Sequence, residues 1–123
     1  MKPEECDILI FKHMLNGDLD AVLALFEETA RFVTGTGDVV EGHEAIRPHV
    51  EACLNAEKLE WTYGPKAYLD STGSLALLRG SWEATFLTSD GNLEVQTGKN
   101  VEVVRKQADG SWRFVIDHAA GAD

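Results

Sequence analysis

The first half of the chain spaces its apolar residues three and four positions apart, as amphipathic helices do. A first helix is predicted over residues 3–15, because Pro3 suits a first helical turn. Its buried stripe is expected to hold Ile8, Phe11, Met14 and Leu15. A second helix should follow "NGD" (16–18), where a glycine can end one helix and an aspartate can cap the next. Its apolar face is Leu19, Val22, Leu23 and Phe26.

The period then changes, and two short strands are predicted at roughly 30–34 and 38–41, joined by "TGTG" (34–37). A third helix is predicted over 44–56. Its buried residues are expected to be Ile46, Val50, Cys53 and Leu54.

From Lys58 onward the pattern alternates, which is typical of β-strands. Four strands are predicted over 58–70, 74–88, 92–106 and 111–120. Asp90-Gly91 and Asp109-Gly110 are strong hairpin signals, and Gly64-Pro65 indicates a bulge or a sheet edge. Helices followed by consecutive strands predict an α+β fold of one domain (1–123), in which three N-terminal helices pack in a curved antiparallel sheet.

Composition narrows the function classes. Eleven basic and twenty-one acidic residues give a net charge of −10, so neither a nucleic acid nor a membrane surface is an expected partner. The N-terminus lacks the features of a signal peptide, and we expect a cytoplasmic location. Two distant cysteines and four histidines without metal-ligand spacing predict no metal site, and no motif calls for a cofactor.

Three segments, "NGDLDAVLALFEETARFV" (16–33), "GHEAIRPHV" (42–50) and "VRKQADGSWRFVIDH" (104–118), occur in an order that resembles the nuclear-transport-factor-2-like superfamily. That superfamily includes ketosteroid isomerase and the SnoaL-like polyketide cyclases. The resemblance implies a cystatin-like cone with a pocket at its open end, and a homodimer that packs through the sheet.

The resemblance transfers few catalytic residues. The isomerase's general-base aspartate corresponds here to Thr34, its tyrosine to Ile10, and its second carboxylic acid to Glu102. Because two of the three roles are missing, steroid isomerisation is not expected. The Asp-Arg-Asp set of the epoxide hydrolases with this fold has no clear equivalent either.

The last strand raises a question of register, because strict alternation places Trp112, Phe114, Ile116 and His118 on one face. A two-residue turn at 109–110 would set Val101 opposite His118 and turn Glu102 away with Asp117. A three-residue loop, 108–110, would set Asn100 opposite His118 and Glu102 opposite Ile116, on the inner face. We favour the second register. The same rule applied to 89–91 adds Leu78, Gly80 and Trp82 to that face.

In this register Glu102 and His118 form an acid–base or hydrogen-bonding pair inside an apolar pocket. The predicted ligand-binding residues are Trp82, Asn100, Phe114, Ile116 and Leu78. The structural alternative is that His118 bonds a backbone carbonyl at the end of a core strand, while Glu102 is solvated or paired with Arg79.

Two function classes remain open. The chain is either a pocket protein that acts on a small hydrophobic carbonyl compound, with isomerase- or cyclase-type proton transfer as its chemistry, or a non-catalytic dimeric ligand-binding or association module. A cavity with converging polar groups favours the first class, and a hollow filled by side chains favours the second.

Overall fold

The computed structural model describes all of residues 1–123 and contains three helices and six strands. In chain order these are α1 (Glu5–Leu15), α2 (Leu19–Leu23), β1 (Phe26–Val33), β2 (Val39–Glu41), α3 (His43–Glu51), β3 (Ala56–Leu69), β4 (Leu75–Leu87), β5 (Leu93–Lys106) and β6 (Trp112–His118). The predicted α+β class is confirmed.

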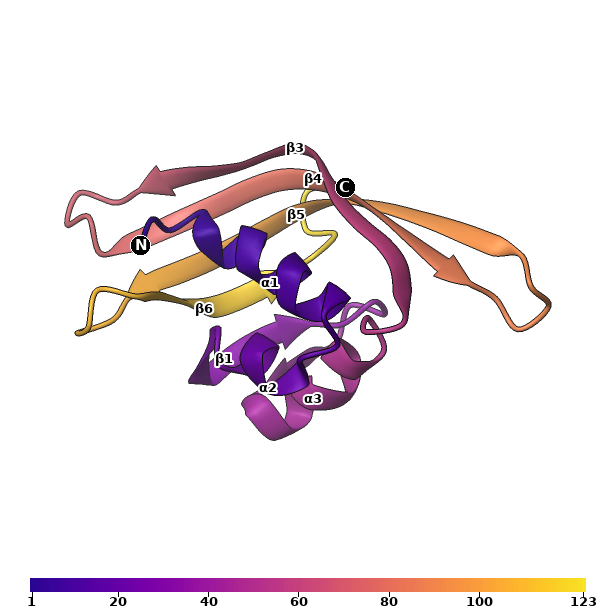
Figure 1. The fold of residues 1–123 in the computed structure, drawn as a ribbon. Coiled ribbons are helices and arrows are strands. Elements are labelled where there is room, and N and C mark those ends of the chain that lie inside the picture. Colours follow the sequence, from indigo (N-terminus) through magenta and orange to yellow (C-terminus); the bar gives the residue numbers. More distant parts are fainter.

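All six strands form one strongly curved sheet, in the order β2-β1-β6-β5-β4-β3. Neighbouring strands pair antiparallel, except that β1 and β6 run parallel to each other. The sequence pattern did not indicate this parallel pair. In Figure 1 helix α1 lies across the concave side of the sheet, while the β4–β5 hairpin projects beyond the body of the molecule. The core therefore lies between the helices and this concave face.

Helix α1 faces the sheet with a different stripe from the one predicted. Its buried residues are Cys6, Asp7, Ile10 and Met14, whereas Ile8 and Leu15 are about half exposed. Helical period alone does not fix the phase of a helix that carries apolar residues on two sides. The corrected phase turns a carboxyl group, that of Asp7, toward the sheet.

The second predicted helix is shorter than expected. It ends at Leu23, and Phe26 already begins strand β1, where its ring packs 5.0 Å from that of Phe114. The Asp18 cap is as predicted, since its carboxylate accepts a hydrogen bond from the Ala21 amide. Helix α3 ends at Glu51 rather than at residue 56, and Ile46 and Val50 are buried as expected.

The two hairpins with Asp-Gly turns, β4–β5 and β5–β6, close with three-residue loops. Thr88 pairs with Asn92 around 89–91, and Gln107 pairs with Ser111 around 108–110. Gly91 and Gly110 have φ of +85° and +86°, which a residue with a side chain rarely adopts. The favoured loop length is therefore confirmed at both turns.

The register of the β5–β6 pair nevertheless changes halfway along the strand. Val104 lies opposite Phe114, as a three-residue loop requires, but Val103 lies opposite Ile116, which leaves Val115 as the extra residue of a β-bulge. Beyond the bulge the alternation is reversed, so that Asp117 faces inward, opposite Glu102, while Ile116 is 41% exposed.

None of the three helices has the length and apolar character that crossing a membrane requires.

Candidate functional site

A cavity of about 120 Å³ lies between α1 and the concave face of the sheet. For comparison, an engineered apolar cavity of about 150 Å³ holds one benzene molecule. Gln96, which lines one end of the cavity, is an exposed residue of the projecting hairpin. The cavity therefore reaches the protein surface at that end and has room for a small ring compound.

Aromatic rings form much of the cavity wall. Phe11 of α1 stacks on Trp61 of β3 with ring centroids 4.4 Å apart. Further rings come from the strands: Phe32, Trp82, Phe86 and Phe114. The Trp82 indole covers Gly98, where an added Cβ would come within 2.4 Å of the ring. Glycine at this position lets the indole lie flat against the sheet.

The segment after β6 completes the wall beside Trp82. The Trp82 Nε1–H group donates a hydrogen bond of 2.6 Å to the carbonyl of Ala119, which itself lines the cavity. Further along, the Ala122 amide donates to the Lys99 carbonyl, and the Lys99 amide donates to Asp123. These bonds fix the C-terminal segment against β5.

Three carboxyl groups meet in this otherwise apolar cavity. Asp7 comes from α1, Glu102 from β5 and Asp117 from β6, and their exposed fractions are 1%, 3% and 7%. Asn100, also buried, donates from Nδ2 to Glu102 at 2.8 Å and to Asp7 at 3.3 Å. The carboxyl groups of Asp7 and Glu102 are also hydrogen-bonded to each other. One of the two must hold a proton for that bond to form.

Burial raises the pKa of all three carboxyl groups. Desolvation raises the pKa of Asp7 to about 6, and the hydrogen bonds with Glu102 and Asn100 offset part of that rise. Burial, followed by the charges of Asp7 and Asp117, raises the pKa of Glu102 well above its usual value. Because the charges of two neighbouring carboxyl groups add to its burial, Glu102 is the member of the pair that holds its proton more tightly.

Asp117 differs from the other two, because no protein group donates a hydrogen bond to it. Desolvation, with a smaller effect from the charge of Asp7, raises its pKa to about 7. The site holds one more acceptor without a partner besides Asp117. It is the Oδ1 atom of Asn100, which is buried and receives no hydrogen bond. Trp61 Nε1 is the one other buried side-chain nitrogen or oxygen without a partner.

No cation neutralises the three carboxyl groups. Arg79, the predicted alternative partner of Glu102, alternates to the opposite face of the sheet, where it donates to the backbone carbonyls of Gly80 and Asn100. The five ion pairs of the protein all involve other acids. No group of three or more His, Cys, Asp or Glu side chains is arranged to hold a metal ion.

The structure brings only part of the predicted site together. Glu102, Asn100, Trp82 and Phe114 line the cavity. Leu78 is fully buried opposite Glu102, but it is in the core rather than in the cavity wall. That the residues which line the cavity bind or act on a ligand stays a prediction.

The placement of His118 and Ile116 was wrong. The bulge at Val115 turns both away from the cavity, so His118 lies opposite Val101 rather than Asn100, and its ring packs against Gly121. Glu102 consequently meets Asp7 and Asp117, and not an imidazole.

Sequence reasoning missed Asp7 and Asp117. Asp7 had a usable signal, because Asp7, Ile10 and Met14 share helical spacing and Asp7 is followed one turn later by Phe11. An acidic residue in the first turn also complements the helix dipole, so the residue type alone does not indicate an inward direction. Asp117 had no such signal, since its inward direction depends on the bulge.

Comparisons with known proteins agree with this architecture. A family model described as "SnoaL-like domain" matches residues 10–117. A ketosteroid isomerase-like protein from Erwinia carotovora atroseptica superposes with a TM-score of 0.78 at 15% identity, covering 94% of this chain and 89% of that one. A nuclear transport factor 2-like protein from Salmonella enterica superposes with a TM-score of 0.76 at 19% sequence identity, covering 98% of this chain and 88% of that one.

An NTF2-like protein with a cystatin-like fold from Novosphingobium aromaticivorans gives a TM-score of 0.73 at 21% identity, covering 98% of this chain and 79% of that one. A search of curated protein sequences gave no significant match. Identities this low establish the fold and leave the activity open. The chain also shares the fold of nuclear transport factor 2-like proteins. Because the family model spans most of the sequence, the chain belongs to the SnoaL-like domain family.

Proposed function

We propose that this protein binds a small hydrophobic compound in the cavity and catalyses proton transfer on it. The observation that carries this proposal is the hydrogen-bonded carboxyl pair of Asp7 and Glu102, buried in a cavity walled by aromatic rings. A buried acid and a buried base side by side are the groups that general acid–base catalysis requires.

A carbonyl compound is the simplest substrate for this pair. When the substrate binds, its carbonyl oxygen replaces Asp7 as the acceptor of the hydrogen bond from protonated Glu102. The Asp7 carboxylate, freed of that bond, accepts a proton from the carbon next to the carbonyl group. The electrons of the broken C–H bond form the enol or enolate, whose negative charge Glu102 stabilises. In a substrate whose enolate is conjugated with a double bond, return of the proton from Asp7 to the far carbon of that double bond completes an isomerisation. In a substrate with a second carbonyl group, attack of the enolate carbon on that carbonyl carbon forms an alkoxide, which takes the proton from Asp7 and completes a cyclisation.

The second function class, a non-catalytic association module, has less support. It needs no hollow and no buried acids, and buried charged groups without partners are costly to keep in a protein that does not use them. The open cavity and the raised carboxyl pKa values therefore favour the pocket function.

Proton transfer can be tested without knowing the natural substrate. Cyclopentanone in D₂O should exchange its α-hydrogens for deuterium faster with the protein than in buffer, as followed by proton NMR. Replacing Glu102→Gln removes the acid and should lower the protein-dependent rate by about 10²-fold or more. His118→Ala, on the same sheet but outside the cavity, should leave the rate unchanged.

Two results would count against the proposal. One is a wild-type rate no higher than that of buffer with an equal concentration of acetate. The other is a Glu102→Gln protein that is folded and retains the full rate.

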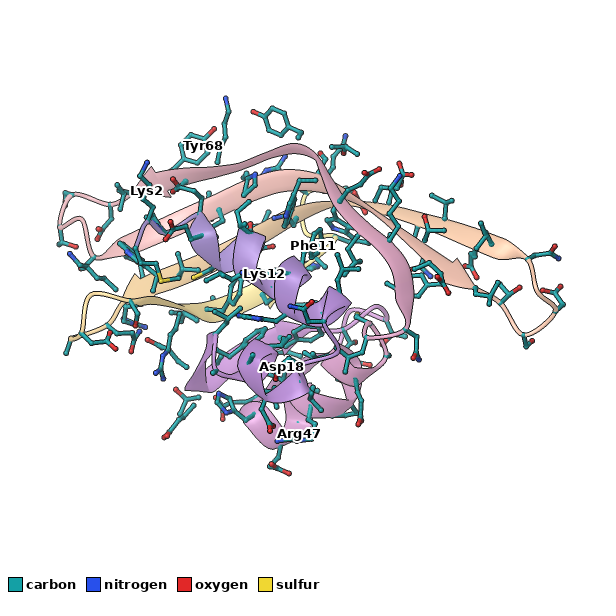
Figure 2. All side chains as sticks on the ribbon, viewed as in Figure 1. Lys2, Phe11, Lys12, Asp18, Arg47 and Tyr68 are labelled. Atoms are coloured by element: carbon teal, nitrogen blue, oxygen red, sulfur yellow. The ribbon has the colours of Figure 1, made fainter.

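We further infer that two copies associate through the convex face of the sheet. Tyr68, Leu77, Val103 and Ile116 form one continuous cross-strand row on that face. Tyr68 is 56% exposed, Leu77 40% and Ile116 41%. Figure 2 shows Tyr68 on the side of the sheet that faces away from α1. An exposed apolar row of this kind is typical of a protein–protein contact.

The association predicts a solution mass of about twice the 13.5 kDa of one chain. Leu77→Glu places a charge in the middle of the row and should produce monomers at micromolar concentration, as measured by sedimentation. The exposed Leu87→Glu, at the tip of the hairpin, is the matched control and should remain dimeric. A monomeric wild-type protein would refute the inference.

A further inference from the structure

The proposed proton transfer uses Asp7 and Glu102 and leaves Asp117 without a role. Asp117 lies directly opposite Glu102 in the β5–β6 pair and beside Phe32 in the β1–β6 pair. It lines the cavity, is 7% exposed, and receives no hydrogen bond from the protein. A buried carboxylate with no donor is costly, and a bound molecule that brings a donor removes that cost.

The surroundings of Asp117 supply no positive charge. From α1 it is faced by Asp7, from β5 by Glu102 and Asn100, and from the segment after α3 by the Cys53 thiol, whose pKa burial raises. The cavity-lining residues include no lysine, arginine or histidine. A positive charge that reaches Asp117 inside the cavity can therefore come only from a ligand.

A second, independent observation is the Oδ1 atom of Asn100. Nδ2 of the same side chain is already committed to Asp7 and Glu102, so Oδ1 can only be satisfied by a donor from elsewhere. Gly80 lies alongside, and a Cβ added there would come within 3.1 Å of Oδ1. The unpartnered Oδ1 atom is thus buried beside Gly80 in the wall of the cavity, where no protein donor reaches it.

The aromatic wall suits a cation as well. The faces of aromatic rings attract ammonium groups, and the attraction is strongest for tryptophan and away from water. Trp61 and Trp82 both line the cavity, and Phe11 stacks on the first of them. Aromatic rings that surround a ligand are a recurrent way to bind an organic cation.

We propose that the substrate of this site carries a basic nitrogen and that Asp117 binds its ammonium group in the cavity. The proposal rests on the proposed function, because it names the class of compound on which Asp7 and Glu102 act. It assigns Asp117 to substrate binding, where an ion pair and hydrogen bond replace its missing protein partner.

Three ring compounds of matched size test the proposal: cyclopentylamine, cyclopentanol and cyclopentanecarboxylate. Their dissociation constants are measured by NMR titration at pH 8 and 0.15 M salt, with the full-length protein. The amine is expected to bind at least about tenfold more tightly than the alcohol, and the carboxylate not to bind, because the cavity is acidic. Asp117→Asn should abolish the preference for the amine while the alcohol still binds.

Because the whole protein is acidic, a general attraction of cations must be separated from the effect of Asp117. Glu57→Gln removes one negative charge at an exposed position and should keep the preference for the amine. Equal binding of amine and alcohol to the wild-type protein would overturn the proposal, as would a preference that persists in Asp117→Asn.

Failure of this proposal can be told apart from failure of the proposed function. If amine and alcohol bind equally while cyclopentanone still exchanges its hydrogens, the assignment of Asp117 fails and proton transfer stands. If none of the three compounds binds and no exchange is catalysed, both fail.

Discussion

Raising the pH from 5 to 8 should lower the free energy of unfolding by about 3 kcal/mol or more, because the folded protein holds buried carboxyl groups with raised pKa values. In the unfolded chain these groups lose their protons near pH 4. In the folded chain Asp7 loses its proton at about 6 and Asp117 at about 7. Between the unfolded and the folded pKa values, the folded state binds more protons than the unfolded state does. The stabilisation that these carboxyl groups contribute is therefore complete below about pH 4 and is lost as the pH rises through their folded pKa values.

Three exposed aspartates, Asp70, Asp90 and Asp109, have lowered pKa values and act in the opposite direction. These three aspartates are ionised in both the folded and the unfolded chain at pH 5 and at pH 8, so their contribution to stability is lost only at more acidic pH. The comparison between those two pH values therefore isolates the buried cluster.

Asp117→Asn tests the group whose pKa burial raises to about 7. The amide has the shape of the protonated acid, so stability at pH 5 should change little. At pH 8 the variant should be more stable than the wild type by about 2 kcal/mol, because it has no buried charge to accommodate. Urea unfolding at both pH values measures the difference, with Glu57→Gln as the surface control.

A stability that is independent of pH between 5 and 8, or that rises, would contradict the burial of these groups. The same conclusion would follow if Asp117→Asn destabilised the protein at pH 8.

Ile10→Ala should destabilise the protein by about 2–4 kcal/mol, because Ile10 is 6% exposed and faces the sheet from α1. Ile8→Ala removes the same atoms two residues earlier, where the side chain is 47% exposed, and should cost less than about 1 kcal/mol. Urea unfolding of the two variants at pH 5, where the carboxyl groups are protonated, makes the comparison direct.

The pair of variants tests the rotation of α1 about its axis. The sequence pattern predicted that Ile8 is buried, and only the observed rotation brings Asp7 to Glu102. If Ile8→Ala proved the more damaging substitution, the helix would be rotated, and Asp7 would no longer reach the cavity.

The turns were predictable because their chemistry is local. Asp-Gly at 90–91 and 109–110 is followed by an alternating strand in each case, and both loops have the favoured length. The positions of Leu78 and Trp82 on the inner face follow from the first of these turns, since the β4–β5 register runs without interruption from Leu87 to Leu75. Local signals thus established most of the sheet.

The carboxyl cluster was not predictable in the same way, because it depends on three long-range features at once. Asp7 requires the phase of α1, Glu102 requires the loop at 108–110, and Asp117 requires the bulge at Val115. A single extra residue in a strand reverses every side chain beyond it. Strict alternation therefore placed His118 where Asp117 lies.

The proposed acid–base site depends on three carboxyl groups that hold protons at a pH where other acids have lost theirs. Titration of the side-chain carboxyl carbons of all 21 aspartates and glutamates by ¹³C NMR measures this directly. The expected result is that Asp7 titrates at about 6, Asp117 at about 7 and Glu102 well above its usual range, each assigned by loss of its signal in the corresponding amide variant. If all 21 groups titrate at or below their ordinary values, the buried acid–base site does not exist.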